Sequence, residues 1–231
     1  MYLSILAFYP YIVRKLFPEL INKQSVVINL DTEAQAWLAK QPPTKLNPLL
    51  DPVVCQTLID ECHRKYDVDF SYGGWMENRS TLWRGTYLDD DQRYIHLGVD
   101  VNVPAGTTVV ADEVCTVIRI DNDYPDKHGW GTRVITKQPH EDVVRVFAHL
   151  DQRLNVRLGD ELKAGAVVGT IGLPPFNGDW FPHLHIQMID THHYDDLLKN
   201  NLRDLDGYGR IQNIEFLRKT FPDPLHSVSL T

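Results

Sequence analysis

The chain has 231 residues, of which 43% are hydrophobic and 23% are charged, a balance that is ordinary for soluble globular domains. This length suits one or two domains, with enough chain to bury a substantial core. The net charge of −8 argues against a general affinity for nucleic acid or for anionic membranes and wall polymers.

The N-terminal run from Met1 to Val13 is apolar, and Arg14 and Lys15 follow it. A secretory signal would carry its positive charge before such a run and a small-residue cleavage site after it, and both are absent. The run is also too short to span a bilayer and is broken by Pro10. We expect a helix that docks on the main domain and no stable membrane insertion, with an interfacial anchor as the alternative. A cytoplasmic location follows, with export by another route left open.

From there to about residue 66 the chain is predicted to be helical. Residues 31–33 can cap a helix over residues 34–40, while Asp51 and Pro52 supply an N-cap and a first-position proline for a helix over residues 53–60. This region offers packing faces and no assignable chemistry, so a small interaction or gating subdomain is the expectation. We divide the chain into three parts: a helical segment 1–70, a β domain 71–190, and an extension 191–231 with a closing helix over 211–220.

The three cysteines, Cys55, Cys62 and Cys115, show no spacing typical of metal ligands. Cys55 and Cys62 would lie two turns apart on one helix, too far for an easy disulfide. We therefore expect buried, small apolar side chains. Sparse cysteine without a disulfide framework favours a reducing compartment.

Two loops have the composition of a binding rim, in which planar side chains contact a ligand. The loop over residues 71–84 is rich in Trp, Tyr, Gly and Arg, and the loop over residues 174–180 ends in Trp180. A well-packed surface loop is the alternative for the first of them. Trp130, with a glycine on either side, can form a hairpin tip or one wall of a narrow groove.

Residues 95–101 mix β-branched residues with a glycine, which predicts an extended segment with a kink rather than a helical turn. Gly98 would let the backbone curl, so that His96 and Asp100 could meet one ion. Histidine and carboxylate both suit Zn²⁺, which in catalytic sites usually takes three protein ligands and leaves a fourth position for water.

The chain after Asp100 is predicted to be rich in strands. Short β-branched runs separated by Gly, Pro and Asp/Asn turns fall at residues 101–103, 107–110, 114–120, 133–136, 143–148 and 167–171. This spacing predicts an antiparallel barrel or sandwich. The whole chain is then mainly β, of the α+β class, with an N-terminal helical segment.

Two further sets of histidines lie in predicted strands. His149 ends the run Phe-Ala-His, and alternation in residues 181–188 places His183 and His185 on one face. One member of that pair would complete a three-ligand site with His96 and Asp100, and the other, together with His149, would handle protons. Hydrogen-bonded filler histidines are the alternative at each position taken alone. The combination predicts a zinc site, although other divalent ions suit the same ligands.

The sequence resembles the lysostaphin and LytM-type zinc metalloendopeptidases, many of which cut peptide cross-links in bacterial cell walls. The resemblance covers residues 71–190 and rests on six motifs: His96-Leu97-Gly98-Val99-Asp100, Val103-Pro104-Ala105-Gly106-Thr107, Phe147-Ala148-His149-Leu150, Val156-Arg157-Leu158-Gly159-Asp160, Lys163-Ala164-Gly165 with Val168-Gly169, and His183-Leu184-His185. It implies an open two-layer β fold of the duplicated-hybrid-motif type.

The same resemblance assigns roles to residues. It implies that His96, Asp100 and His185 are the zinc ligands and that His149 and His183 flank the water that zinc activates. An Asn or Arg upstream of the first motif often binds substrate in this family, which makes Asn78, Arg79 and Arg84 candidates beside Trp130 and Trp180.

The expected function is zinc-dependent hydrolysis of a peptide bond, in peptidoglycan cross-links or in small glycine-containing peptides. The expected partner is a peptide or muropeptide substrate. Two alternatives stay open: a non-catalytic, zinc-containing binding or regulatory module, and an intracellular hydrolase of a non-wall substrate. A fourth protein ligand, or a helix that plugs the groove, would favour the non-catalytic module.

Overall fold

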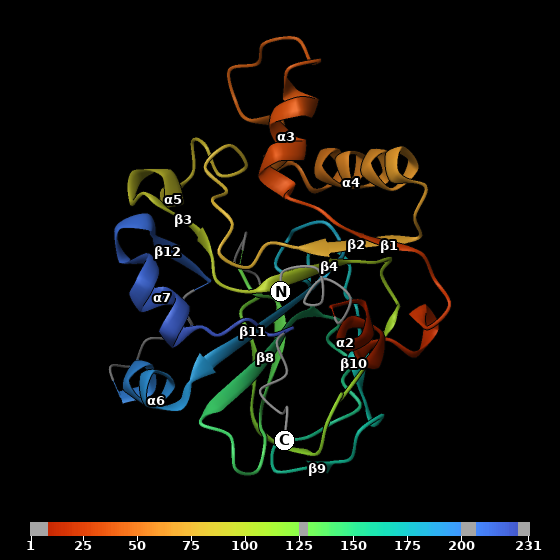
Figure 1. The fold of residues 1–231 in the computed structure, drawn as a ribbon, viewed down its shortest axis with the longest axis vertical. Helices are drawn as coiled ribbons and strands as arrows, with labels where there is room; N and C mark the ends of the chain where they lie inside the picture. The colour runs from red at the N-terminus through yellow and green to blue at the C-terminus, as the bar shows by residue number, and fades with distance from the viewer. Residues whose placement is uncertain (1–8, 125–128, 200–206, 226–231) are drawn as a thin grey trace, which may run out of the picture.

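The structure is a computed structural model that describes residues 9–124, 129–199 and 207–225 (Figure 1). The described strands form one eight-stranded sheet and two small two-stranded sheets. In spatial order the large sheet contains β1 (Ser25–Val27), β2 (Phe70–Gly73), β4 (Val99–Asn102), β11 (Leu184–Asp190), β8 (Val143–Leu150), β7 (Thr132–Lys137), β6 (Cys115–Asn122) and β9 (Glu161–Leu162). The small sheets pair β5 (Thr108–Val110) with β10 (Val167–Thr170) and β3 (Arg93–His96) with β12 (Tyr208–Arg210).

The predicted class, mainly β with some helices, is confirmed. The β-branched runs form strands because they fill a pleated surface that is buried on its inner face, and the pairs from β2 through β9 are antiparallel. The large sheet is open, so the structure lacks the closed barrel that was one form of the prediction. β1 pairs with β2 in parallel, which joins the N-terminal segment to the same sheet.

Helices pack against these sheets. They are α2 (Tyr9–Leu16), α3 (Leu30–Leu38), α4 (Pro52–Tyr66), α5 (Tyr87–Asp90), α6 (Thr191–Lys199) and α7 (Ile214–Thr220), with short 3-10 turns at Pro18–Leu20, Pro48–Leu50 and Ile211–Asn213. Figure 1 shows α3 and α4 together beside the β1–β2 edge. None of the helices within the described ranges is long and apolar enough to cross a membrane.

The predicted caps are partly right. The Asp51 carboxylate accepts hydrogen bonds from the backbone amides of Val53 and Val54, as expected for the N-cap of α4. The prediction that residues 31–33 cap the preceding helix is wrong, because the helix starts earlier. Its N-cap is Asn29, whose side chain accepts from the Thr32 amide at 2.8 Å.

The apolar core has three parts. One part lies between the large sheet and the β5–β10 pair and includes Phe70 and Phe147. A second lies under α3 and α4, where Cys55 and Cys62 are buried with free thiols. The third lies under α6 and α7. Each fully buried Phe contributes about 1.5–3 kcal/mol relative to an exposed one, so this packing stabilises the sheet that carries the site described below.

The ends of the chain follow the prediction in part. The closing helix is confirmed as α7, and a 3-10 turn precedes it. The expected N-terminal helix is present as α2, while residues 1–8 lie outside the described part of the chain. The division at residues 70 and 190 stays a prediction.

Candidate metal centre

Three adjacent strands bring the predicted site residues together. In β11, His185 lies directly opposite Asp100 of β4 on one side and Ala148 of β8 on the other. The next residue of β8 is His149, and His96 ends β3 four residues before Asp100. Segments that are far apart in the sequence therefore converge because β11 is the middle strand of the three.

The three predicted ligands present their donor atoms at ligand-to-ligand spacing. His96 Nε2 lies 3.0 Å from His185 Nδ1 and 3.5 Å from Asp100 Oδ1, and His185 Nδ1 lies 3.0 Å from the same oxygen. Donors about 2.0–2.1 Å from a tetrahedral zinc ion are about 3.3 Å apart. These residues form a group of possible metal ligands in the structure, and all three are buried. The triangle fits one zinc ion.

Hydrogen bonds to one ring nitrogen of each candidate ligand histidine fix its tautomer. His96 Nδ1 donates to the carbonyl oxygen of Gly74 at 3.0 Å, and His185 Nε2 donates to Gln187 Oε1 at 3.0 Å. A carbonyl oxygen can only accept, so each of these nitrogens carries the ring's proton. The opposite nitrogens then have lone pairs, and these face each other and the Asp100 carboxylate. Three acceptors at such short range suit a cation between them.

Burial and charge around the site favour the protonation states in which the candidate ligands could bind a metal. Burial, followed by the field of Arg79, holds the pKa of His96 well below its ordinary value. Burial alone would raise the pKa of Asp100, but His96 and Arg79 outweigh it and hold this pKa well below the usual range. Asp100 is therefore ionised and His96 is neutral at pH 7.

The two predicted proton-handling histidines lie beside this triangle. Their rings are 4.3 Å apart between centroids, and His183 Nε2 lies 3.7 Å from Asp100 Oδ1. His149 Nδ1 donates to the carbonyl of Asn177 and His183 Nδ1 to that of Phe181, at 2.8 and 2.7 Å. Burial lowers both pKa values, that of His149 to well below the ordinary range. Each ring is neutral and has an Nε2 lone pair.

Backbone geometry at the site is unusual in two places. His149 has a φ of 63°, a left-handed conformation that non-glycine residues adopt rarely and that recurs at functional sites. Gly98 packs against the His185 ring, and a Cβ there would lie 2.5 Å from His185 Nε2. The sequence predicted a glycine that lets the chain curl. The structure gives a different reason, which is the close approach of an imidazole.

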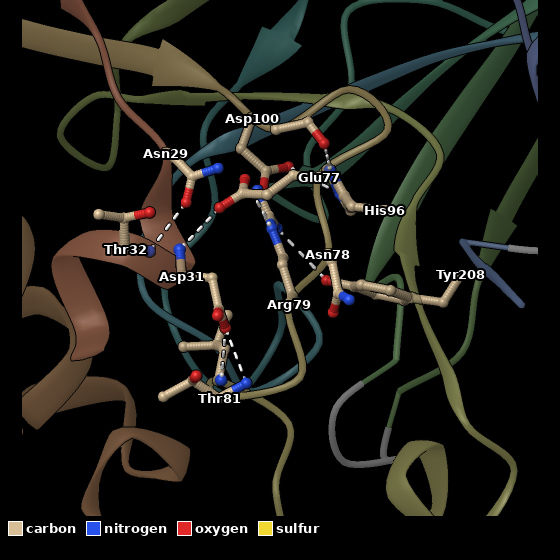
Figure 2. A network of polar contacts seen from close by, with 12 residues as sticks. Asn29, Asp31, Thr32, Glu77, Asn78, Arg79, Thr81, His96, Asp100 and Tyr208 are labelled. Atoms are coloured by element: carbon tan, nitrogen blue, oxygen red, sulfur yellow. Dashed lines mark hydrogen bonds and ion pairs between the residues drawn. The ribbon is translucent and has the colours of Figure 1, made fainter. Parts of the chain in front are cut away.

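A cavity of about 740 Å³ opens above the five residues. Arg79, Trp130 and Trp180 are among the residues that line it, whereas Asn78 and Arg84 are exposed and are not part of the lining. The substrate-binding roles of these two arginines, two tryptophans and one asparagine stay predictions. Arg79, in addition, is 3% exposed and donates to Asp100 Oδ2 at 2.6 Å, so its guanidinium also contacts a candidate ligand (Figure 2).

Sequence reasoning missed several residues that support the site. Gln187 follows His185 by two positions, so the alternation that paired the histidines could have indicated it. Tyr208 packs its ring 5.2 Å from that of His96, between centroids, and lines the cavity. No local pattern marks Tyr208, since it comes from the C-terminal extension and reaches the site through the β3–β12 pairing.

One segment of the chain matches a known protein family. The model described as peptidase family M23 matches residues 94–196, whereas no curated protein matches the chain. Similar solved structures include LytU, with 28% identity over 42% of this chain and 63% of that chain and a TM-score of 0.37. The catalytic domain of a point mutant of the prophage-encoded M23 protein EnpA from Enterococcus faecalis has 26% identity over 42% of this chain and 68% of that chain, with a TM-score of 0.35.

Lysostaphin from Staphylococcus simulans, an antimicrobial peptidase, has 22% identity over 55% of this chain and 44% of that chain, with a TM-score of 0.37. The chain thus spans less than two thirds of LytU and less than half of lysostaphin. The matched segment 94–196 contains the three candidate ligands and both neighbouring histidines. The similarity to peptidase family M23 thus lies in this one segment, which is less than half of the chain.

Proposed function

We propose that the protein is a zinc-dependent endopeptidase that hydrolyses peptide bonds, either in peptidoglycan cross-links or in small glycine-containing peptides. The single observation that carries this proposal is the convergence of three acceptor atoms, from His96, Asp100 and His185, at 3.0–3.5 Å. The match of residues 94–196 to a peptidase family supports the reaction class.

The ligand set would hold zinc through His96 Nε2, Asp100 Oδ1 and His185 Nδ1. Zinc in such a site polarises a carbonyl and lowers the pKa of water towards neutrality. The chain's own contribution is to fix the imidazole tautomers through Gly74 and Gln187, which keeps the lone pairs aimed at one point.

His149 and His183 divide the proton chemistry. Either Nε2 lone pair can accept the proton of the attacking water, and the imidazolium that forms can pass it to the leaving amine. The other imidazole, once protonated, can donate a hydrogen bond to a developing oxyanion, and the Asp100 carboxylate favours that protonated form at His183.

A catalytic role fits better than a non-catalytic zinc module. The module would need a fourth protein ligand or a plugged groove. Among the described residues, the group of candidate ligands has three members. The first residue in the sequence that lines the cavity is Arg79, so α3 and α4 do not enter the cavity. A hydrolase with a non-wall substrate inside the cell is a second candidate, favoured by the net charge of −8.

Metal content tests the proposal first. Elemental mass spectrometry of the purified protein should give about one zinc per chain, and Asp100→Ala should lose it. His149→Ala should keep the zinc but lose turnover of peptides and muropeptides, since its imidazole handles only the proton. A wild-type protein that cannot be loaded with zinc would overturn the enzyme assignment. Zinc-loaded protein that is inactive on peptides and muropeptides would support the module instead.

A further inference from the structure

Arg79 is a buried cation held between three partners. Its Nη1 donates to Asp100 Oδ2 at 2.6 Å and to the Tyr208 hydroxyl at 3.3 Å, while its Nε donates to Glu77 Oε2 at 3.2 Å. Arg79 and Glu77 are 3% and 6% exposed. A buried charge is costly unless it is paired, so each partner constrains the others.

Glu77 connects this cation to the N-terminal segment. Its second oxygen, Oε1, accepts from the backbone amide of Asp31 at 2.7 Å. That amide lies in the first turn of α3, where N–H groups have no partner within the helix and the helix dipole attracts an anion. Figure 2 shows the resulting line from α3 through Glu77 and Arg79 to Asp100.

The start of α3 is itself fixed in place. The Asp31 carboxylate accepts from the amides of Thr81 and Leu82 at 2.8 and 3.0 Å, which ties α3 to the loop that follows Arg79. At the other end, a Cβ on Gly74 would lie 2.2 Å from Arg79 Nη2 and 2.9 Å from His96 Nδ1. Arg79 and His96 therefore pack on one glycine and have little room to move independently.

Charge gives Glu77 a second effect on the metal position. A divalent cation at Asp100 would face the positive guanidinium of Arg79 across a single carboxylate. The Glu77 carboxylate offsets that guanidinium charge in a buried setting, where electrostatic effects are stronger than in water. Without the Glu77 carboxylate, the electrostatic potential at the zinc position would become more positive, and Arg79 would lose one of its hydrogen-bond partners.

We propose that Glu77 and Arg79 are positioning residues that couple helix α3 to the zinc ligand Asp100. The N-terminal segment is then a functional part of the metal centre, although it lies outside the M23 segment and does not line the cavity. The inference rests on the zinc site proposed above. Because coupling between two sites is reciprocal, α3 should strengthen zinc binding and zinc should steady the start of α3.

The first test is zinc affinity, measured in the full chain by competition with a chromophoric chelator. Glu77→Gln keeps an oxygen that can accept from the Asp31 amide but removes the charge. We expect its zinc Kd to rise about tenfold, in the range found for partners of metal ligands. Glu33→Gln is the matched control, since Glu33 is also on α3 but pairs with Lys65. Its zinc Kd should equal that of the wild type.

The second test needs no variant. Amide hydrogen exchange is followed by NMR in the wild type with and without zinc. Zinc should slow exchange of the Asp31 amide more than exchange in α6, because only the former is tied to Asp100 through Glu77 and Arg79. If Glu77→Gln does not fold, this measurement alone tests the coupling between α3 and the zinc site.

The outcomes separate the two proposals. Zinc binding that leaves the Asp31 amide unchanged relative to α6 would overturn the coupling and leave the metallopeptidase intact. Equal zinc affinities of Glu77→Gln, Glu33→Gln and wild type would do the same. A wild type that binds no zinc would remove the metal centre itself, and the coupling with it.

Discussion

Replacing Gln187 with leucine should weaken zinc binding although this residue is not one of the ligands. Gln187 is fully buried, and its Oε1 accepts the His185 Nε2 proton at 3.0 Å. Leucine has a similar size and no acceptor. The buried His185 N–H is then left without an acceptor, which costs about 1–3 kcal/mol.

The metal-free variant can avoid this cost. The proton moves to His185 Nδ1, where Asp100 Oδ1 lies 3.0 Å away and can accept it. Zinc binding must then reverse the tautomer and break that hydrogen bond. The penalty of about 1–3 kcal/mol corresponds to a rise in zinc Kd of about 5-fold to 150-fold, since 1.4 kcal/mol is tenfold.

The assay is chelator competition on metal-free protein, with ¹⁵N NMR of the imidazoles to identify the His185 tautomer. Gln187→Glu is the informative partner variant, because it restores an acceptor for the Nε2 proton and should restore most of the affinity. Wild-type zinc affinity in Gln187→Leu would refute the role of tautomer control. Equal weakness of the Leu and Glu variants would refute it as well.

Two further predictions concern the same centre. Gly98→Ala should abolish tight zinc binding, because the new Cβ would lie 2.5 Å from His185 Nε2. It should also destabilise the fold by roughly 1–3 kcal/mol, as overpacking of a core does. Zinc titration and thermal unfolding measure the two effects, and an unchanged zinc Kd would contradict the reasoning. The metal-free protein should lose stability as pH falls below about 6.5, because burial lowers the pKa of His96, His149 and His183 in the folded state, so the unfolded chain takes up protons first. Urea unfolding at several pH values checks this, and a stability that stays constant from pH 7 to pH 5 would count against it.

The sequence predicted the parts of the molecule that depend on local pattern. The alternation around His183 and His185 predicted that both rings lie on one face, because a strand has a period of two. Both rings do lie near Asp100, although β11 starts only at Leu184. The Asp51-Pro52 pair marked the start of α4 because capping involves only the next three residues. The β-branched runs gave the mainly β class for the same kind of reason.

What the sequence did not predict depends on contacts between distant segments. Arg79 meets Tyr208 across 129 positions, and no local pattern carries that information. The cap of α3 was missed because Asn29 and Asp31 are both good capping residues, and the choice between them depends on Glu77, which accepts from the Asp31 amide. Closure of the sheet into a barrel also depends on whether its two edge strands pair with each other, and these strands are far apart in the sequence.

The parallel pairing of β1 with β2 has a consequence for shortened forms of the protein. Ser25–Val27 cover the hydrogen-bonding edge of Phe70–Gly73, whose other edge is paired with β4. A form cut at residue 70 or later, for instance to isolate the β domain, would leave a row of unpaired amide and carbonyl groups on an outer strand. Such bare edges recruit strands from other molecules, so a truncated protein is expected to self-associate and precipitate where the whole chain remains in solution.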